Sequence, residues 1–186
     1  GAPILTSLAV LRSGGGIVSL LSLPEVCGAC ASRLPEAVQL PVPAEISWLS
    51  VALGELPRTN VAIVGPGLGR SDAALEFAVA LWKAWNRPLL MDGDALYALA
   101  VSGVFTPRTN TVLTPHEGEA ARLLSMTPEE IRQNREWAAK ALAERWGCVL
   151  LKGEGTLIVS SETKKMVRLD CGGPELSVPG SGDVLS

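Results

Sequence analysis

Four short segments of the chain are rich in glycine or in charged residues, and each follows a short apolar run. They are "GPGLG" (65–69), "DGDAL" (92–96), "TPHEGE" (114–119) and "KGEGT" (152–156). Glycine lets the backbone approach a ligand closely and adopt positive φ angles. In parallel α/β sheets, ligands bind beyond the carboxyl ends of the strands. If the apolar runs are strands, the four segments are loops that gather at one ligand site.

Three of these segments suit particular ligands, and each also has a plain structural interpretation. Gly67 lies either in a loop that lets a ligand approach or in a tight strand-to-helix turn, because the spacing is not the dinucleotide fingerprint. Lys152 can reach a phosphate, although it precedes its glycines, and the alternative is a surface turn. His116, the only histidine, is either structural or part of a site with the two carboxylates beside it.

The segment "GSGD" (180–183) precedes an apolar stretch and is typical of a helix start. We expect the backbone N–H groups of Ser181, Gly182 and Asp183 to point at one place, with the positive end of the helix dipole behind them. Such an arrangement binds phosphate. Asp183 can then accept the proton of an alcohol that attacks phosphorus. The alternative is that Asp183 only caps the helix.

The elements that would position these segments alternate along the chain. Helical spacing of apolar residues predicts helices over 3–13, 71–86 and 128–146. Short apolar runs predict strands over 17–23, 38–42, 61–64, 88–91, 112–113 and 148–151, and a β-hairpin from 157–159 and 166–169. The alternation predicts an α/β sandwich with a mostly parallel sheet. We expect Trp82 and Trp85 in the core, and a helix 128–146 that Thr127 and Glu130 cap as a capping box.

Composition narrows the classes of function. Net charge is −3 and no basic stripe exists, so nucleic acid is not an expected partner. No apolar run approaches the roughly 20 residues that span a membrane. Cys27 and Cys30 form a CxxC without the second pair that zinc needs, so they are either a redox pair at a helix start or plain buried cysteines. Without a disulfide framework we expect a cytoplasmic protein. Both ends of the chain look cut, which predicts a single truncated domain over 1–186.

Taken together, the ordered motifs resemble those of a known family. "GPGLG", "DGDAL", "LTPHEGEAARLL", "LLKGEGT" and "GSGDVLS" look like the motifs of the ribokinase-like, ADP/ATP-dependent NAD(P)H-hydrate dehydratases. "GAPILTSLAVLRSGGGIVSL" resembles that family's first helix and second strand, so the resemblance covers nearly the whole chain. It implies a ribokinase-like three-layer α/β/α sandwich. It also implies that ADP or ATP phosphorylates the C6 hydroxyl of hydrated NADH or NADPH, and that loss of phosphate restores the reduced cofactor.

The resemblance also implies roles for individual residues. The hydrate would contact Ala2, Gly67, His116 and Asp183, and Asp183 would act as the base. The nucleotide would lie on a run of residues and on the last motif, namely Lys152, Gly153, Glu154, Gly155, Thr156, Ser181 and Gly182. Glu119 keeps the acidic position used around Mg²⁺ in kinase relatives, so we expect it on the metal side. The apolar composition favours a homo-oligomer.

The chain also departs from the family pattern. Glu117 stands where the family usually has proline, and Glu175 adds a negative charge before "GSGD". Two other functions therefore remain open. One is a ribokinase-like kinase for a vitamin precursor such as hydroxymethylpyrimidine or pyridoxal, although such kinases tend to carry asparagine at the position of His116. The other is a non-catalytic nucleotide-binding module.

Overall fold

The computed structural model describes residues 1–186, and contacts between residues divide them into two compact units. Unit 1 consists of residues 1–59 together with 177–186, and unit 2 consists of residues 60–176. The single truncated domain expected from the sequence stays a prediction. No helix combines the length and the apolar character that crossing a membrane requires.

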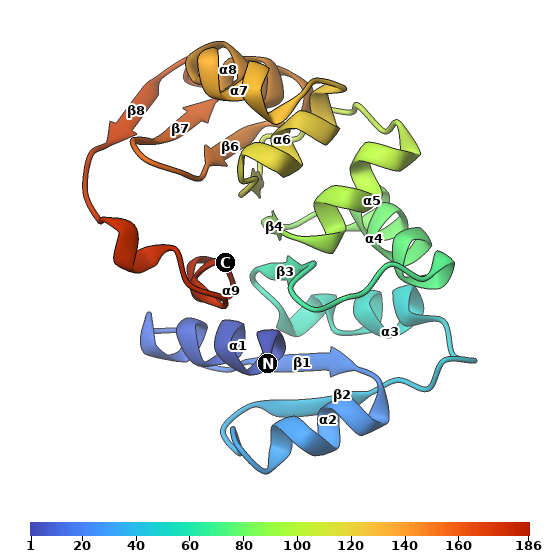
Figure 1. The fold of residues 1–186 in the computed structure, drawn as a ribbon. Coiled ribbons are helices and arrows are strands. Elements are labelled where there is room, and N and C mark those ends of the chain that lie inside the picture. The colour runs from blue at the N-terminus through green and yellow to red at the C-terminus, as the bar shows by residue number, and fades with distance from the viewer. The chain divides into compact units, whose positions relative to one another are not determined.

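Unit 1 contains a small parallel sheet, four α-helices and one 3₁₀ turn. In chain order its elements are α1 (Ala2–Arg12), β1 (Ser19–Ser22), α2 (Pro24–Ala31), β2 (Val38–Pro41), α3 (Trp48–Gly54), the 3₁₀ turn η1 (Leu56–Arg58) and α9 (Ser181–Leu185). Strands β1 and β2 pair in parallel as a two-stranded sheet. Helix α9, from the end of the chain, lies beside α1 from its start (Figure 1). The predicted helix over 3–13 and the strands over 17–23 and 38–42 are confirmed, whereas α3 was not predicted.

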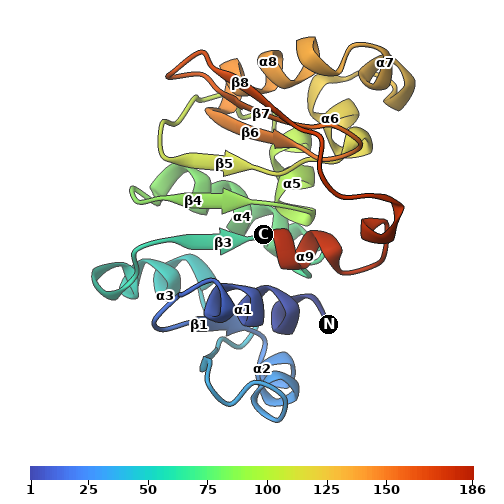
Figure 2. The ribbon, with the colours of Figure 1, turned by 90° about the vertical axis from the view of Figure 1, so that its left-hand side faces the viewer.

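Unit 2 is built around a six-stranded sheet in the order β3-β4-β5-β6-β7-β8. Its elements are β3 (Ala62–Val64), α4 (Asp72–Ala84), β4 (Leu89–Met91), α5 (Asp94–Ser102), β5 (Thr111–Leu113), α6 (Glu117–Leu124), α7 (Pro128–Gln133), α8 (Arg135–Trp146), β6 (Cys148–Leu151), β7 (Thr156–Ser160), β8 (Met166–Leu169) and η2 (Pro174–Leu176). Strands β3 to β6 are parallel, and β7 and β8 are antiparallel to their neighbours. Figure 2 shows β3, β4 and β5 side by side. The α/β class, the mostly parallel sheet and the hairpin are therefore confirmed.

The core of unit 2 contains the apolar helix residues that the sequence periodicity predicted to be buried. Ser71 caps α4, and its hydroxyl accepts a hydrogen bond from the Ala74 amide at 3.3 Å. The face of α4 that follows this cap is buried, and Trp82 and Trp85 are only 1% and 3% exposed. The two tryptophans are therefore core residues, as predicted.

The predicted helix over 128–146 is wrong as a single element. It is divided at Asn134, whose backbone angles of φ −134° and ψ 42° are not helical. The Asn134 side-chain amide donates to the Glu130 carbonyl at 3.2 Å, and short polar side chains that bond nearby backbone compete with helix continuation. The capping box is confirmed, because the Thr127 amide donates to Glu130 at 2.7 Å and the Glu130 amide donates to the Thr127 hydroxyl at 3.3 Å.

Two of the four expected loops run directly into helices. Helix α5 begins at Asp94, inside "DGDAL", and α6 begins at Glu117, inside "TPHEGE". Only the first residues of each segment form the turn from strand to helix. Each turn is consequently short, and the polar residue at its start lies directly at the end of a strand.

Candidate functional site

The parallel strands of unit 2 end at one edge of the sheet, and a chemically useful residue follows each of them. Gly65 follows β3, Asp92 follows β4, Thr114 follows β5 and Lys152 follows β6. The registers pair Val64 with Met91 and Met91 with Leu113, so these ends are level. The expectation that the four segments gather at the carboxyl ends of parallel strands is confirmed for unit 2.

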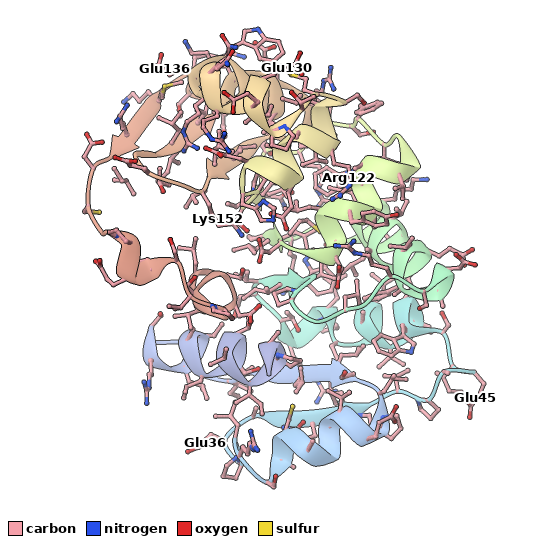
Figure 3. All side chains as sticks on the ribbon, in the orientation of Figure 1. Glu36, Glu45, Arg122, Glu130, Glu136 and Lys152 are labelled. Atoms are coloured by element: carbon pink, nitrogen blue, oxygen red, sulfur yellow. The ribbon has the colours of Figure 1, made fainter.

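Side chains at this edge form a compact polar group. The Lys152 ammonium lies 2.8 Å from Asp92 Oδ1, and the Thr114 hydroxyl donates to the same oxygen at 2.7 Å. Glu119 Oε2 lies 3.9 Å from the Lys152 ammonium. We call Asp92, Thr114, Glu119 and Lys152 the strand-end cluster; Figure 3 labels Lys152 just beyond β6. The Asp92 side chain is only 6% exposed, so its shared oxygen is satisfied by Lys152 and Thr114.

Asp92 and Thr114 were not assigned roles from the sequence. The available signal was position alone, because each directly follows a buried strand, as Lys152 does. Lys152 itself was expected to reach a phosphate, and in the structure its ammonium is turned toward the two carboxylates of the cluster.

Glu119 is the acidic residue expected on the metal side. Its side chain is 13% exposed, and burial raises its pKa above the usual carboxyl value, although the His116 amide and the Lys152 charge oppose the increase. One of its oxygens accepts the His116 amide at 2.8 Å. The structure contains no group of three or more His, Cys, Asp and Glu side chains that could hold a metal ion.

His116 has a clear structural role. It is the N-cap of α6, and its Nδ1 accepts hydrogen bonds from the amides of Gly118 at 3.0 Å and Glu119 at 3.3 Å. A neutral imidazole that accepts at Nδ1 carries its proton on Nε2. The side chain is 59% exposed, so the cap leaves the imidazole accessible to a ligand. The structural and the functional interpretation are compatible.

The "KGEGT" segment forms a tight loop between β6 and β7. Gly153 and Gly155 both adopt positive φ, at 135° and 62°, which favours glycine at these positions. The Thr156 hydroxyl closes the loop by donating to the Gly153 carbonyl at 3.0 Å. An open depression of about 400 Å³ lies against the loop, lined by His116, Glu117, Gly118, Pro128, Arg132, Lys152, Gly153 and Glu154. The structure thus brings four predicted site residues of unit 2 to one depression.

The "GPGLG" segment is a tight turn that is tied to the neighbouring strand. Gly65 is buried at φ 122°, and a Cβ there would lie 1.7 Å from the Asp92 carbonyl oxygen. The Gly69 amide donates to Asp94 at 3.0 Å, and Arg70 pairs with the same carboxylate at 2.8 Å. Gly67 is exposed at φ 67°. The turn interpretation is therefore correct, and it leaves Gly67 open to a ligand.

The remaining predicted residues belong to unit 1. Ala2 is the first residue of α1. Gly180, at φ 92°, precedes α9, and the Thr6 hydroxyl donates to the Asp183 carbonyl at 2.9 Å. The Ser181 amide donates to the Val178 carbonyl at 3.2 Å. The expectation that three amides point at one place is therefore wrong for Ser181, because a turn within the chain already uses that donor.

The CxxC pair is structural. Cys27 and Cys30 lie on α2, and each is 3% exposed. Burial raises the pKa of the Cys27 thiol, which disfavours the reactive thiolate. Of the two interpretations of this motif, plain buried cysteines is the correct one.

Comparison with known proteins decides the family. The family model described as NAD(P)H-hydrate dehydratase (Carb_kinase) matches residues 1–186. The chain belongs to this family. It is 37% identical over 196 residues to the bifunctional NAD(P)H-hydrate repair enzyme Nnr of Thermanaerovibrio acidaminovorans. That match covers 100% of this chain and 38% of the relative, so the chain spans well under half of the relative's length.

Solved structures confirm the ribokinase-like fold. A ribokinase-like superfamily protein of Enterococcus faecalis superposes with a TM-score of 0.83 at 24% identity, over 100% of this chain and 63% of that one. The ADP/ATP-dependent NAD(P)H-hydrate dehydratase of Bacillus subtilis, co-crystallised with ATP and Mg²⁺, gives a TM-score of 0.79 at 26% identity. It covers 100% of this chain and 64% of that one. Both the fold and the family expected of an NAD(P)H-hydrate dehydratase are thus confirmed.

Proposed function

We propose that the chain carries out the nucleotide-dependent repair of hydrated NADH and NADPH. The C6 hydroxyl attacks the terminal phosphorus of ADP or ATP, its proton passes to a base, and the shortened nucleotide leaves. Inorganic phosphate then leaves C6 and a proton leaves the neighbouring ring carbon, which forms the ring double bond and restores the reduced nicotinamide. The observation that carries this proposal is the NAD(P)H-hydrate dehydratase match over all of residues 1–186.

For the nucleotide we propose the "KGEGT" residues Lys152, Gly153, Glu154, Gly155 and Thr156, with Ser181 and Gly182 of the last motif. Support comes from the positive-φ glycines, which leave the loop backbone open, and from the 400 Å³ depression beside it. Nucleotide phosphates would compete with Asp92 for the Lys152 ammonium, which lies 2.8 Å from that carboxylate. Lys152 would therefore bind phosphate by exchanging one anionic partner for another.

The donor set fits Mg²⁺ only as an ion shared with the nucleotide. Mg²⁺ usually keeps several waters and takes one or two protein carboxylates together with substrate phosphates. Glu119 would supply one such carboxylate. When bound, Mg²⁺ would offset phosphate charge. Glu119 is suited to this role because its carboxylate is already held by the His116 amide at 2.8 Å.

For the hydrate we propose Ala2, Gly67, His116 and Asp183. Support comes from the exposure of the His116 imidazole and of Gly67. Asp183 is the proposed base. Its backbone carbonyl accepts a hydrogen bond from the Thr6 hydroxyl at 2.9 Å, which holds the first turn of α9.

The test is incubation of the purified protein with hydrated NADH, Mg²⁺ and either ADP or ATP. We expect the absorbance of reduced nicotinamide to return only when nucleotide is present. Hydroxymethylpyrimidine and pyridoxal, tested in parallel, should be phosphorylated little. Rapid phosphorylation of either vitamin precursor without repair of the hydrate would replace this proposal with the vitamin-kinase alternative. Assembly into a homo-oligomer stays a prediction that light scattering can check.

A further inference from the structure

One arginine lies beneath the "KGEGT" loop and contacts its backbone at several points. The Arg135 guanidinium donates to the carbonyls of Leu151 at 3.3 Å, Lys152 at 3.4 Å and Gly155 at 3.4 Å. Its side chain is only 15% exposed. These carbonyls belong to the end of β6 and to the loop itself, so a single side chain spans the loop from its entry to its far side.

The loop and the guanidinium also fit each other sterically. A Cβ added at Gly153 would lie 2.7 Å from an Arg135 guanidinium nitrogen. Gly153 therefore serves two purposes, because it adopts φ 135° and it leaves space for the arginine. The break at Asn134 makes Arg135 the first residue of α8, where its side chain starts a new helix rather than continuing the face of α7.

Glu117 also holds this guanidinium. Glu117 Oε1 lies 2.7 Å from Arg135, and its other oxygen lies 3.3 Å from Arg132. Glu117 is the first residue of α6, directly after His116. The Lys152 amide also donates to the Pro115 carbonyl at 2.8 Å. Two connections, one through side chains and one through backbone, thus join the turn that carries His116 to the "KGEGT" loop.

We propose that Arg135, held by Glu117, is a positioning residue that keeps the "KGEGT" loop in the shape that binds nucleotide. This inference rests on the proposed function, which assigns the nucleotide to that loop. Arginine suits the task because its planar fork offers five donors in fixed directions, whereas lysine offers a single compact charge. Arg135→Lys therefore keeps the charge and loses the simultaneous contacts to Glu117 and to the three carbonyls.

The experiment compares three single variants and one double variant of the purified protein. Arg135→Lys and Glu117→Gln, alone and combined, change the proposed pair, and Lys140→Gln is a matched control on an exposed position of α8. Three quantities are measured for each: hydrogen exchange of the Lys152 amide without nucleotide, the Kd of ADP and ATP by calorimetry, and the Kd of hydrated NADH. Thermal unfolding verifies that every variant is folded.

We expect Arg135→Lys to raise the nucleotide Kd about tenfold, the loss typical of a charge-assisted hydrogen bond. Glu117→Gln, which is nearly isosteric, should raise the nucleotide Kd about threefold. The Arg135 guanidinium keeps its carbonyl contacts and loses only the negative charge of its partner. In the double variant, Glu117→Gln should add little to the increase in Kd caused by Arg135→Lys, because the two residues act as one unit. Lys152 amide exchange should accelerate in both variants, with the Kd of the hydrate within twofold of wild type. Lys140→Gln should leave all three quantities near wild type.

The experiment distinguishes failure of the positioning role from failure of the proposed function. If Arg135→Lys leaves both Lys152 exchange and nucleotide Kd at wild-type values, the positioning role is wrong while the proposed function stands. If the wild-type protein binds no ADP or ATP, the proposed function is wrong and the nucleotide role of Arg135 falls with it. Accelerated Lys152 exchange in that case would leave Arg135 as a structural support of the loop only.

Discussion

The strand-end cluster of unit 2 and the α9 segment of unit 1 differ in how they are held. In the cluster, Asp92 is buried and satisfied by the Lys152 ammonium at 2.8 Å and the Thr114 hydroxyl at 2.7 Å. Helix α9 has five residues and is held mainly by packing on α1 and by the bond from Thr6 to Asp183 at 2.9 Å. Residues of the cluster should therefore govern stability, whereas Asp183 should govern turnover with little effect on the fold.

The largest expected effect is on turnover, from Asp183→Asn. Asparagine keeps the size and polarity of the side chain but does not accept the proton of the attacking hydroxyl. A positioned general base contributes about 10²–10⁴-fold, so turnover should fall by that factor while nucleotide Kd and Tm stay nearly unchanged. Steady-state repair rates and calorimetric titration of ADP measure the two quantities. Near-normal turnover would mean that Asp183 only caps α9, since asparagine caps about as well as aspartate.

The next effect is on stability, from Gly65→Ala, with Gly69→Ala as its matched control. Both glycines have positive φ, but a Cβ at Gly65 would lie 1.7 Å from the Asp92 carbonyl, whereas one at Gly69 would have nothing within 4 Å. We expect a loss in the free energy of unfolding of about 3 kcal/mol for Gly65→Ala and about 1 kcal/mol for Gly69→Ala. Urea unfolding measures both. Equal losses would show that strain in φ, rather than close approach to β4, explains the need for glycine.

Two ion pairs of equal length test whether burial controls the contribution of an ion pair to stability. The Lys152–Asp92 and Arg70–Asp94 pairs both measure 2.8 Å, but Asp92 is 6% exposed and the Arg70 side chain is 55% exposed. Breaking a buried pair costs about 3–5 kcal/mol, and partial exposure of Lys152 lowers this, so we expect Asp92→Asn to cost about 2–3 kcal/mol. Arg70→Gln should cost much less, because a solvent-exposed ion pair contributes little to stability. If chemical denaturation gives similar values for the two variants, burial of Asp92 does not control its contribution.

The smallest effect concerns pH and Glu119. Burial raises the pKa of Glu119 in the folded protein, so the folded state holds its proton to higher pH than the unfolded state does. Its contribution to stability is therefore fully present below the unfolded pKa of about 4.3, and is lost as pH rises through the folded pKa. Glu119→Gln removes this loss. The difference in Tm between the variant and wild type should therefore increase from pH 4 to pH 8. Calorimetry in a buffer series of constant ionic strength measures this difference. A difference that stays flat or falls would contradict the raised pKa of Glu119.

Much of the fold was readable from the sequence because its signals are local. The capping box of Thr127 and Glu130, the Ser71 cap and the apolar runs of β3 to β6 all depend on neighbours in the chain. The division at Asn134 was not predicted, because the apolar periodicity continues through 128–146 and a single side-chain bond to Glu130 decides the outcome. Helix starts inside "DGDAL" and "TPHEGE" were missed because glycine and acidic residues are also typical of loops.

The site was predicted only in outline. Gathering of the segments at one sheet edge follows from parallel strands, and Lys152 and His116 were identified by position and rarity. The partners of Asp92 could not be derived, because they depend on which strands are neighbours in the sheet. Arg135 was missed for the same reason, since its contacts lie 16 to 20 residues away in the chain.

The proposed function, that this member of the NAD(P)H-hydrate dehydratase family uses nucleotide to repair the hydrate, is tested most directly by stoichiometry. Inorganic phosphate and reduced nicotinamide absorbance are followed in the same reaction, which contains hydrated NADH, Mg²⁺ and ATP. The account predicts one phosphate released for each NADH recovered, with neither product formed when nucleotide or hydrate is omitted. Recovery of NADH without phosphate release, or phosphate release that is independent of the hydrate, would contradict it.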